Sequence, residues 1–472
     1  MPGENVNLTN AAVPLSRPAD TGKLFVPGPL ERGSTSEPII VHGMPEFKAK
    51  AGGKISQSYL YDGAEAFFQE GGETLILGRQ VGTTPVAASV ELENVGAAKV
   101  LKVAAKSVGE WGNALTVQVK AGGVEGSYRL VIAENGVAVE ESTDLLTQAA
   151  GATWSTEHST HVTVTVLGGS GNPKVVAATA LTGGTADLAH LTTATAEAAV
   201  ALWPYDLGCG QVSSGGNTSS ATQTAILAHC EINNRTPLPD LQDTTTSGTL
   251  VSAVSSLHTV TGARRGAPYA PWAIIPGSAP GTTRKVPYSF IQAGIFARND
   301  ATSSPPNVNE PSAGENGKPR YAIGLTAEWN RATRETLNEA GINVARIMPD
   351  GSIETYGNRT LVNPETEPAW GTISAARLFM YVISQGEIIL RRFTFKTIDP
   401  HGLLFGRIAG ELKAFLGSLG NQISNNANEA VNTGPSVNTP ETLVRKELCA
   451  AIEVLPSPDA ETATLNITAR AE

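Results

Sequence analysis

The chain has 472 residues, of which 41% are hydrophobic and only 6% aromatic, and it contains 49 glycines and 29 prolines. This length predicts two to four domains with sizeable buried cores and many turns. The formal net charge of −10 argues against nucleic acid as a partner, because nucleic-acid-binding domains usually carry an excess of lysine and arginine.

The sequence predicts neither a signal peptide nor a membrane-spanning segment. Residues Met1–Asn5 lack a basic region followed by an apolar core, and no apolar run reaches the ~18 residues needed to cross a bilayer. The best candidate, Leu378–Ile383, is interrupted by Ser384. We therefore expect a soluble chain that is made in a cytoplasm and does not insert into a membrane.

The first 84 residues predict an extended arm followed by the beginning of a core. Residues 1–22 contain three prolines and little periodicity, which is typical of an arm. Residues 23–84 contain an amphipathic helix that buries Phe67 and Phe68, and glycines are expected to end this helix. Strands are predicted at 24–26, 39–41 and 74–77, and the helix-ending residues are Gly71 and Gly72.

Residues 85–185 change to short alternating apolar runs, which indicate an inserted, mostly antiparallel β-rich domain. Asn135-Gly136 lies between two of these runs and predicts a tight hairpin. Trp111 is interpreted as a packing anchor, with a ligand-stacking platform as the alternative. The predicted strands are 100–103, 115–119, 128–132, 137–139 and 162–166.

Residues 186–362 alternate between helical and strand patterns, which predicts a doubly wound α/β sheet. The stretches 211–220 and 301–318 are rich in Gly, Ser, Pro or Asn and are expected to be surface loops. Gly341 is expected to end the last of these helices. Helices are predicted at 186–201, 221–231, 250–257, 286–297 and 331–340, and strands at 272–275 and 342–347.

Residues 363–458 predict a C-terminal α+β domain, and residues 459–472 a final extended strand. A helix over 404–419 has one apolar stripe at helical spacing, with polar residues opposite it. The other predicted elements are a helix at 375–390 and strands at 448–455 and 462–469. The polar residues opposite the stripe are Arg407, Glu411 and Lys413.

No residues in the sequence form a convincing catalytic, cofactor or metal site. Asn217–Thr222 is weakly similar to the nucleophile turn of subtilisin, but no histidine turn or aspartate turn accompanies it. There is no phosphate-binding Gly-rich loop and no His-Glu-x-x-His zinc motif. We therefore expect a protein that is not an enzyme and that binds neither a cofactor nor a metal.

Three cysteines, Cys209, Cys230 and Cys449, are too few and too scattered for a structural zinc site. Buried, inert thiols are the simplest interpretation, above all for Cys230 on a predicted helix. An inter-subunit disulfide between Cys209 and Cys449 is an alternative, because Cys209 adjoins a loop expected to be exposed and Cys449 precedes the final strands.

Eight short motifs along nearly the whole chain resemble, in the right order, those of contractile tail sheath proteins from long-tailed phages and related injection machines. The chain departs from the family pattern at 286–289, where Val-Pro-Tyr-Ser replaces Pro-Pro-Ser-Gly. The matching stretches are Phe25-Val-Pro-Gly28 with Glu31-Arg-Gly33, Phe47, Phe67 to Arg79, Ala104 to Asn113, Ala270-Pro-Trp272, Val286 to Asp300, Leu337 to Asn343 and Tyr356 to Leu361.

The resemblance implies a structural subunit built on a non-catalytic, subtilisin-like sheet. Such subunits polymerise as stacked hexameric rings around a tail tube and contract to drive the tube through a target envelope. The implied partners are further copies of the chain, the tube protein, and baseplate and tail terminator proteins. The implied location is the virion tail, assembled in the host cytoplasm.

The resemblance also assigns roles to the termini and to the C-terminal helix. The terminal arms are expected to add strands to the sheet of a neighbouring subunit, and the C-terminal domain is expected to face the tube. Pairing of Arg407 and Lys413 with an acidic tube is one hypothesis for this helix, and a simply solvated face is the alternative of equal weight. The candidate exchanged residues are Val6, Leu8, Val13, Leu465 and Ile467.

Two other classes of protein remain open. One is a β-rich carbohydrate-binding or adhesin-like virion protein, which Trp111 and Trp154 would support. The other is an inactive subtilisin-like enzyme.

Overall fold

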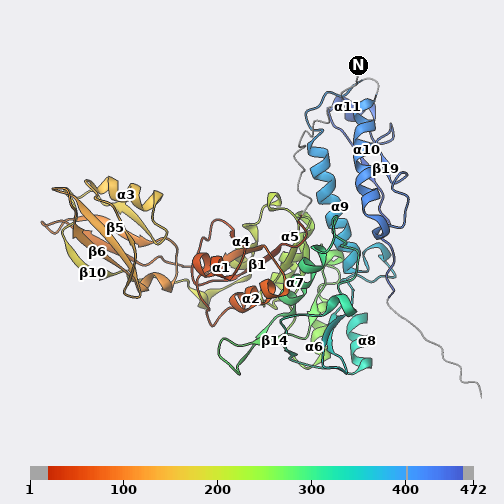
Figure 1. Cartoon of the computed structure of the whole chain (residues 1–472), viewed down its shortest axis with the longest axis horizontal. Coiled ribbons are helices and arrows are strands. Elements are labelled where there is room, and N and C mark those ends of the chain that lie inside the picture. The colour runs from red at the N-terminus through yellow and green to blue at the C-terminus, as the bar shows by residue number, and fades with distance from the viewer. Residues whose placement is uncertain (1–19, 400–401, 461–472) are drawn as a thin grey trace, which may run out of the picture.

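The computed structural model describes residues 20–399 and 402–460, which form three bodies along the long axis of the molecule (Figure 1). A β-rich domain lies at one end, an α/β core lies in the middle, and a helical C-terminal domain stands at the other end. Each body has its own buried hydrophobic cluster.

A five-stranded sheet in the order β12-β11-β1-β3-β2 forms the centre of the core. Four of its strands run parallel, and only the edge strand β2 is antiparallel. The sheet joins the segments 23–84 and 186–362 into one unit. The strand bounds are β1 Leu24–Pro29, β2 Ile39–Val41, β3 Leu75–Gln80, β11 Gln211–Ser213 and β12 Thr236–Leu238.

The expected surface loop at 211–220 is wrong in its first three residues, which form the buried strand β11. Ser213 can lie inside the core because its hydroxyl donates to Asp240 Oδ2 at 3.2 Å. A polar residue is tolerated in a core when its hydrogen bonds are satisfied there.

Helices cover both faces of this sheet, because alternate residues of each strand point to opposite sides. Leu24 and Leu75 face one layer, which holds α2 (Leu60–Glu70) and α7 (Tyr288–Asp300). Phe25 and Ile76 face the other layer. That layer holds α4 (Thr193–Ala201) and α5 (Ser220–Ile232). The expectation of a mixed α/β fold is confirmed.

Helices α2 and α7 pack closely because each presents a glycine to the other. A Cβ atom on Gly63 would lie 2.6 Å from the ring of Phe290, and one on Gly294 would lie 2.3 Å from the Cβ of Glu70. Gly71 ends α2 in a left-handed conformation with φ of 110°, so the predicted helix stop is confirmed.

The inserted domain is an antiparallel β-structure with two sheets, β10-β6-β7-β8 and β4-β5-β9. The Asn135-Gly136 hairpin between β7 and β8 is confirmed, with both residues at positive φ. The bounds are β4 Ser89–Glu93, β5 Lys99–Ala105, β6 Leu115–Ala121, β7 Tyr128–Glu134, β8 Val137–Glu141, β9 Val162–Val166 and β10 Val176–Ala180.

Both tryptophans of the inserted domain belong to its core. Trp111 and Trp154 are each 7% exposed and pack in the same cluster, so the packing interpretation of Trp111 is confirmed. Trp154 lies on α3 (Gln148–Glu157), a helix that the sequence analysis missed because its residues are mostly small or polar. The ligand-platform argument for an adhesin thereby loses its support.

The remaining elements of the core differ from expectation mainly at their ends. The helix expected at 186–201 begins only at Thr193, since Thr192 caps it with its side chain. The helix expected at 286–297 begins at Tyr288. Val286 precedes Pro287, and a residue before proline rarely adopts helical geometry. The other bounds are α1 Met44–Ala51, α6 Ser247–Ser255, α8 Arg331–Glu339, β13 Tyr269–Ala270, β14 Ala273–Pro276, β15 Thr283–Val286, β16 Gly324–Leu325, β17 Asn343–Ile347 and β18 Ile353–Tyr356.

The C-terminal domain is built on the helix pair α9 (Ile373–Arg391) and α10 (Leu403–Ser418). The predicted apolar stripe of α10 is confirmed, since Leu404, Ile408, Leu412 and Leu416 are buried. By length and composition alone α9 could cross a membrane, but most of it is buried inside the protein.

The predicted strand at 448–455 is reduced to β20 (Ala451–Ile452), which pairs with β19 (Val431–Asn432). The side chain of Asn438 bonds both the N–H and the C=O of Cys449 and so replaces a strand partner there. A short helix, α11 (Pro440–Val444), lies between the two strands. The predicted strand at 462–469 lies outside the described residues.

Arg79 fastens the inserted domain to the core. It is 2% exposed, and its guanidinium donates to the carbonyls of Leu30, Glu31, Gly33 and Val108 at 2.7–3.2 Å. Three of these carbonyls belong to the loop after β1, and the fourth, that of Val108, lies between β5 and β6 of the inserted domain. Burial lowers the pKa of Arg79 to about 10, so it stays charged at neutral pH.

Replacing Arg79 by lysine is expected to lower the free energy of unfolding by about 3 kcal/mol. An ammonium group cannot reach four carbonyls held by one planar guanidinium, so buried carbonyls lose their donors. Denaturant unfolding followed by tryptophan fluorescence measures this loss. Arg331→Lys on the exposed surface of α8 is the control and should change stability by less than about 0.5 kcal/mol. Equal effects of the two variants would contradict the role of Arg79.

Candidate assembly surfaces

The two-stranded sheet β19-β20 is the strongest candidate for accepting strands from another subunit. Among the residues that the structure describes, β19 and β20 pair only with each other, and each pairs through two residues. Val431 packs on the helix pair, so one face of the sheet is covered. A pair this short is marginal alone, and its outer edges offer main-chain groups to further strands.

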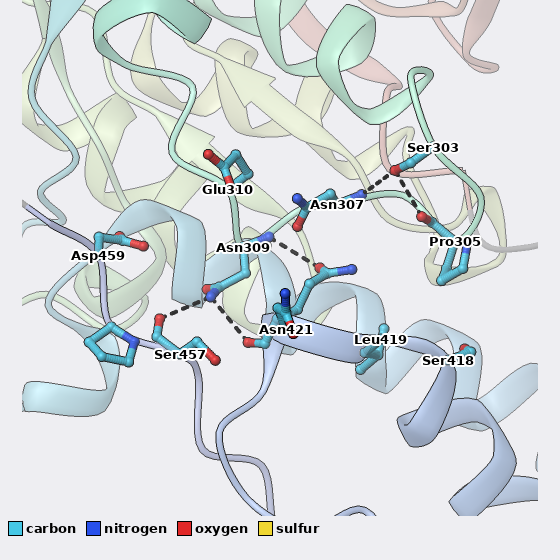
Figure 2. Close-up of a pocket in the computed structure, with 12 residues that line it drawn as sticks. Ser303, Pro305, Asn307, Asn309, Glu310, Ser418, Leu419, Asn421, Ser457 and Asp459 are labelled. Atoms are coloured by element: carbon cyan, nitrogen blue, oxygen red, sulfur yellow. Dashed lines mark hydrogen bonds between the residues drawn. The ribbon is translucent and has the colours of Figure 1, made fainter.

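A polar joint connects this domain to the loop at 301–318 of the core (Figure 2). Asn309 is buried, and its amide group donates to the carbonyls of Gln422 and Ser457 at 3.1 and 3.0 Å. The side chain of Gln422 in turn accepts from the Asn309 N–H and donates to the carbonyl of Pro306. Beside these bonds lies a cavity of about 370 Å³.

The last described residues of the chain are tied to the core at this joint. Asp459 Oδ2 accepts hydrogen bonds from Asn358 Nδ2 at 2.7 Å and from Ser374 Oγ at 3.0 Å. The C-terminal segment that follows therefore departs from a fixed point on the subunit. The candidate exchanged residues Leu465 and Ile467 lie outside the described residues, as do Val6, Leu8 and Val13.

The three polar residues singled out on α10 do not share one position around the helix. Arg407 is exposed, whereas Glu411 and Lys413 are partly buried. Arg407 and Lys413 lie about 120° apart around the axis. Glu411 pairs with Arg392 at 3.0 Å within the subunit. Between Arg407 and Lys413 the exposed face carries small residues, namely Gly406, Gly410, Ala414 and Gly417.

The cysteines are less accessible than the disulfide hypothesis requires. Cys209 is 3% exposed, so its expected exposure is wrong, and its thiol donates to the carbonyl of Asp20 at 3.5 Å. Cys230 is fully buried, as expected, and burial raises its pKa to about 12. Cys449 is partly exposed. The burial of Cys209 argues against a bond between Cys209 and Cys449 of different subunits.

The carboxyl ends of the parallel strands hold one buried carboxyl group, that of Asp240. Its Oδ2 accepts from the hydroxyls of Ser213 and Ser214 at 3.2 Å and from the N–H of Gly216 at 2.8 Å. Burial raises the pKa of Asp240. No histidine is among these hydrogen-bond partners. Within the described ranges, no group of three or more His, Cys, Asp or Glu residues could hold a metal ion.

Comparison with solved structures finds the same fold in sheath proteins of contractile systems. The sheath tail protein of Desulfitobacterium hafniense matches with a TM-score of 0.59 at 15% identity, over 92% of this chain and 94% of that one. The sheath tail protein of Listeria innocua matches with a TM-score of 0.63 at 13% identity, over 88% and 89%.

A third match is the anti-feeding prophage helical sheath in its contracted state, with a TM-score of 0.55 at 15% identity, over 99% of this chain and 98% of that one. No protein-family model and no curated protein sequence matches the chain. This chain has the fold of contractile-system sheath proteins. The family resemblance of its motifs is thus confirmed at the level of the fold.

Asn309→Ala is expected to lower the free energy of unfolding of the C-terminal domain by about 2 kcal/mol, because the side-chain hydrogen bonds to the carbonyls of Gln422 and Ser457 are both lost. It should also speed proteolysis near Ser457, measured by limited digestion and mass spectrometry. The control is Asn316→Ala, an exposed asparagine of the same loop. If both variants were cut at the rate of the parent chain, Asn309 would not hold the joint.

Proposed function

We propose that the chain is the structural subunit of a contractile sheath. Copies would stack as hexameric rings around a tail tube, and the polymer would shorten to drive the tube through a target envelope. The observation that carries this proposal is the fold match to a helical sheath over almost the entire length of both chains. Eight family motifs in the matching order support it from the sequence.

The arrangement into three bodies, each with a buried hydrophobic cluster, suits a subunit that must exist in two assemblies. Contraction requires the same subunit to pack in two ways, with its domains moving as rigid units. The joints include buried hydrogen bonds at Arg79 and at Asn309. The joint to the C-terminal domain also has apolar contacts, since Ile373 and Ala376 of α9 pack in the core cluster and Val308 packs in the C-terminal cluster. We infer that the bodies keep their internal packing while their surroundings in the polymer change.

We propose that neighbouring subunits are linked by exchanged strands. The N-terminal residues Val6, Leu8 and Val13 and the C-terminal residues Leu465 and Ile467 would add to the open edges of β19-β20 in another copy. Main-chain hydrogen bonds of this kind are independent of side-chain fit. The links would therefore survive when the domains rotate during contraction.

The other partners in the proposal are a tube protein on the inner surface and baseplate and terminator proteins at the two ends. The particle would be a tail assembled in the host cytoplasm. We also propose that the parallel sheet is a subtilisin-like frame used without catalysis. The partners of Asp240, which are hydroxyls and a backbone amide, support this interpretation.

Deleting residues 1–18 or residues 460–472 is expected to leave a folded subunit that forms no tubes, as judged by circular dichroism and electron microscopy. A single-residue test is sharper. Ile467→Pro removes a main-chain donor and should abolish tubes, whereas Ile467→Val keeps a strand-forming residue and should preserve them. Normal tubes from Ile467→Pro and from both truncations would exclude strand exchange.

The combined change Arg407→Glu and Lys413→Glu is expected to weaken co-assembly with purified tube protein about tenfold at low salt and much less at about 0.5 M salt. Charges on an exposed helix face are screened over ~10 Å at 0.1 M salt. The control variant reverses the charges of Lys99 and Lys174 by the same change to glutamate, and these two residues lie on the inserted domain. Co-sedimentation of sheath with tube gives the measurement, and a loss that does not depend on salt would rule out charge pairing.

A further inference from the structure

One aromatic residue of the C-terminal domain is presented entirely to the outside. Phe395 lies in the loop between α9 and α10, at the end of this domain that is farther from the core (Figure 1), and it is 103% exposed. Its backbone has a φ of 64°, a left-handed conformation that bulky residues rarely adopt. Folding of the single subunit therefore gains nothing from this ring and is strained by its backbone.

The loop holds Phe395 in place from both sides. Phe393 and Ile398 pack against the C-terminal cluster, one on each side of the exposed ring in sequence. The Lys396 N–H donates to the carbonyl of Phe393 at 3.1 Å and closes the turn around Phe395. A ring that is already held in position loses little conformational entropy on binding, and aromatic side chains often dominate the energy of protein interfaces. Phe395 thus has the properties of an interface anchor.

The same chain carries an apolar groove of about 660 Å³ between α9 and the strand ends where β1 and β3 begin. We call it the α9 groove. It lies at the opposite end of the parallel strands from Asp240. Its apolar lining is partly exposed, since only Ile76 of the four aliphatic side chains is fully buried. The other three are Ile40, Leu207 and Ile388.

The charges that line the α9 groove nearly balance. Lys23 Nζ donates to the carbonyl of Leu207 at 3.0 Å, and Glu387 Oε1 accepts from the hydroxyl of Tyr205. Because neither sign dominates, the aliphatic lining decides what the groove takes, and it matches an uncharged apolar side chain. The charged or titratable residues of the lining are Asp20, Asp206 and Glu387 on the acidic side, and Lys23, Arg391 and His42 on the basic side.

We propose that the α9 groove of one copy of the chain receives Phe395 of a second copy. The ring is fully exposed on its own subunit, so it does not occupy its own groove. A projecting ring and an apolar groove at two places on one chain form a self-complementary pair. This one contact accounts for the strained, exposed ring and for the partly exposed aliphatic lining. It goes beyond the proposed sheath function, since it requires neither a tube nor exchanged termini.

Disulfide trapping between two different full-length variants tests the proposal. One chain carries Lys396→Cys, next to the ring, and the other carries Asp206→Cys on the groove lining. Both carry Cys449→Ser, because Cys449 is partly exposed. After mild oxidation, this pair should form a mixed dimer at least about fivefold faster than Lys396→Cys with Ile383→Cys, because a disulfide needs close Cα atoms. Ile383 is 40% exposed on α9 and does not line the groove, so it is a matched control.

The ring itself is tested in the chain that carries Lys396→Cys. Adding Phe395→Ala should slow trapping about tenfold, whereas Phe395→Tyr should leave the rate within about twofold. Equal rates at positions 206 and 383, or a rate that Phe395→Ala does not change, would overturn the proposal.

A stability measurement separates an interface anchor from a structural residue. Phe395→Asn should raise the Tm of the dilute subunit by about 1 °C, because asparagine adopts the left-handed conformation more readily. A lower Tm would overturn the proposal, since the ring would then support its own subunit. Chains that trap as expected but never form tubes would contradict the sheath function alone. Chains that form tubes without trapping would contradict the groove contact alone.

Discussion

The pairing of β1 with β3 on one side and with β11 on the other is the constraint on which the rest of the structure depends. It places Leu24 beside both Leu75 and Gln211, so residues far apart in sequence share one sheet. The inserted domain leaves from the end of β3 and the chain returns to the core before β11. The helix layers and the Arg79 joint take their positions from this sheet.

The contacts between the three bodies contain more hydrogen bonds between named side chains and main-chain carbonyls than apolar packing alone would need. Within each body, aliphatic and aromatic side chains pack in buried clusters, of which the core has three. Between bodies, Arg79 and Asn309 donate hydrogen bonds and Asp459 accepts them. Ile373 and Ala376 of α9 and Val308 of the core loop add apolar contacts between the core and the C-terminal domain. The hydrogen bonds fix one geometry when intact, and each contributes about 1 kcal/mol net. A subunit that changes its packing in a polymer can exchange them at modest cost.

The sequence predicted those elements whose local signals agree with their environment. The α10 stripe, the Gly71 helix stop and the Asn135-Gly136 hairpin depend on spacing and backbone geometry, and all three are present. Strand β11 was missed because Ser and Gly indicate a loop until Asp240 is known to satisfy them. Helix α3 was missed because its sequence shows little amphipathic pattern.

The candidate surfaces were predictable only in part, since they depend on contacts between distant segments. The burial of Cys209 depends on Asp20, and the loss of most of the 448–455 strand depends on Asn438. The sequence pointed to the termini as exchange segments, which lie outside the described residues. The structure adds a two-stranded sheet whose strands, among the residues described, pair only with each other.

Electron microscopy of the purified full-length protein tests the central claim most directly. The account predicts long hollow tubes with a helical repeat, formed by the chain alone or on added tube protein. Dispersed single particles at every protein concentration, with tube protein present and with both termini intact, would contradict it.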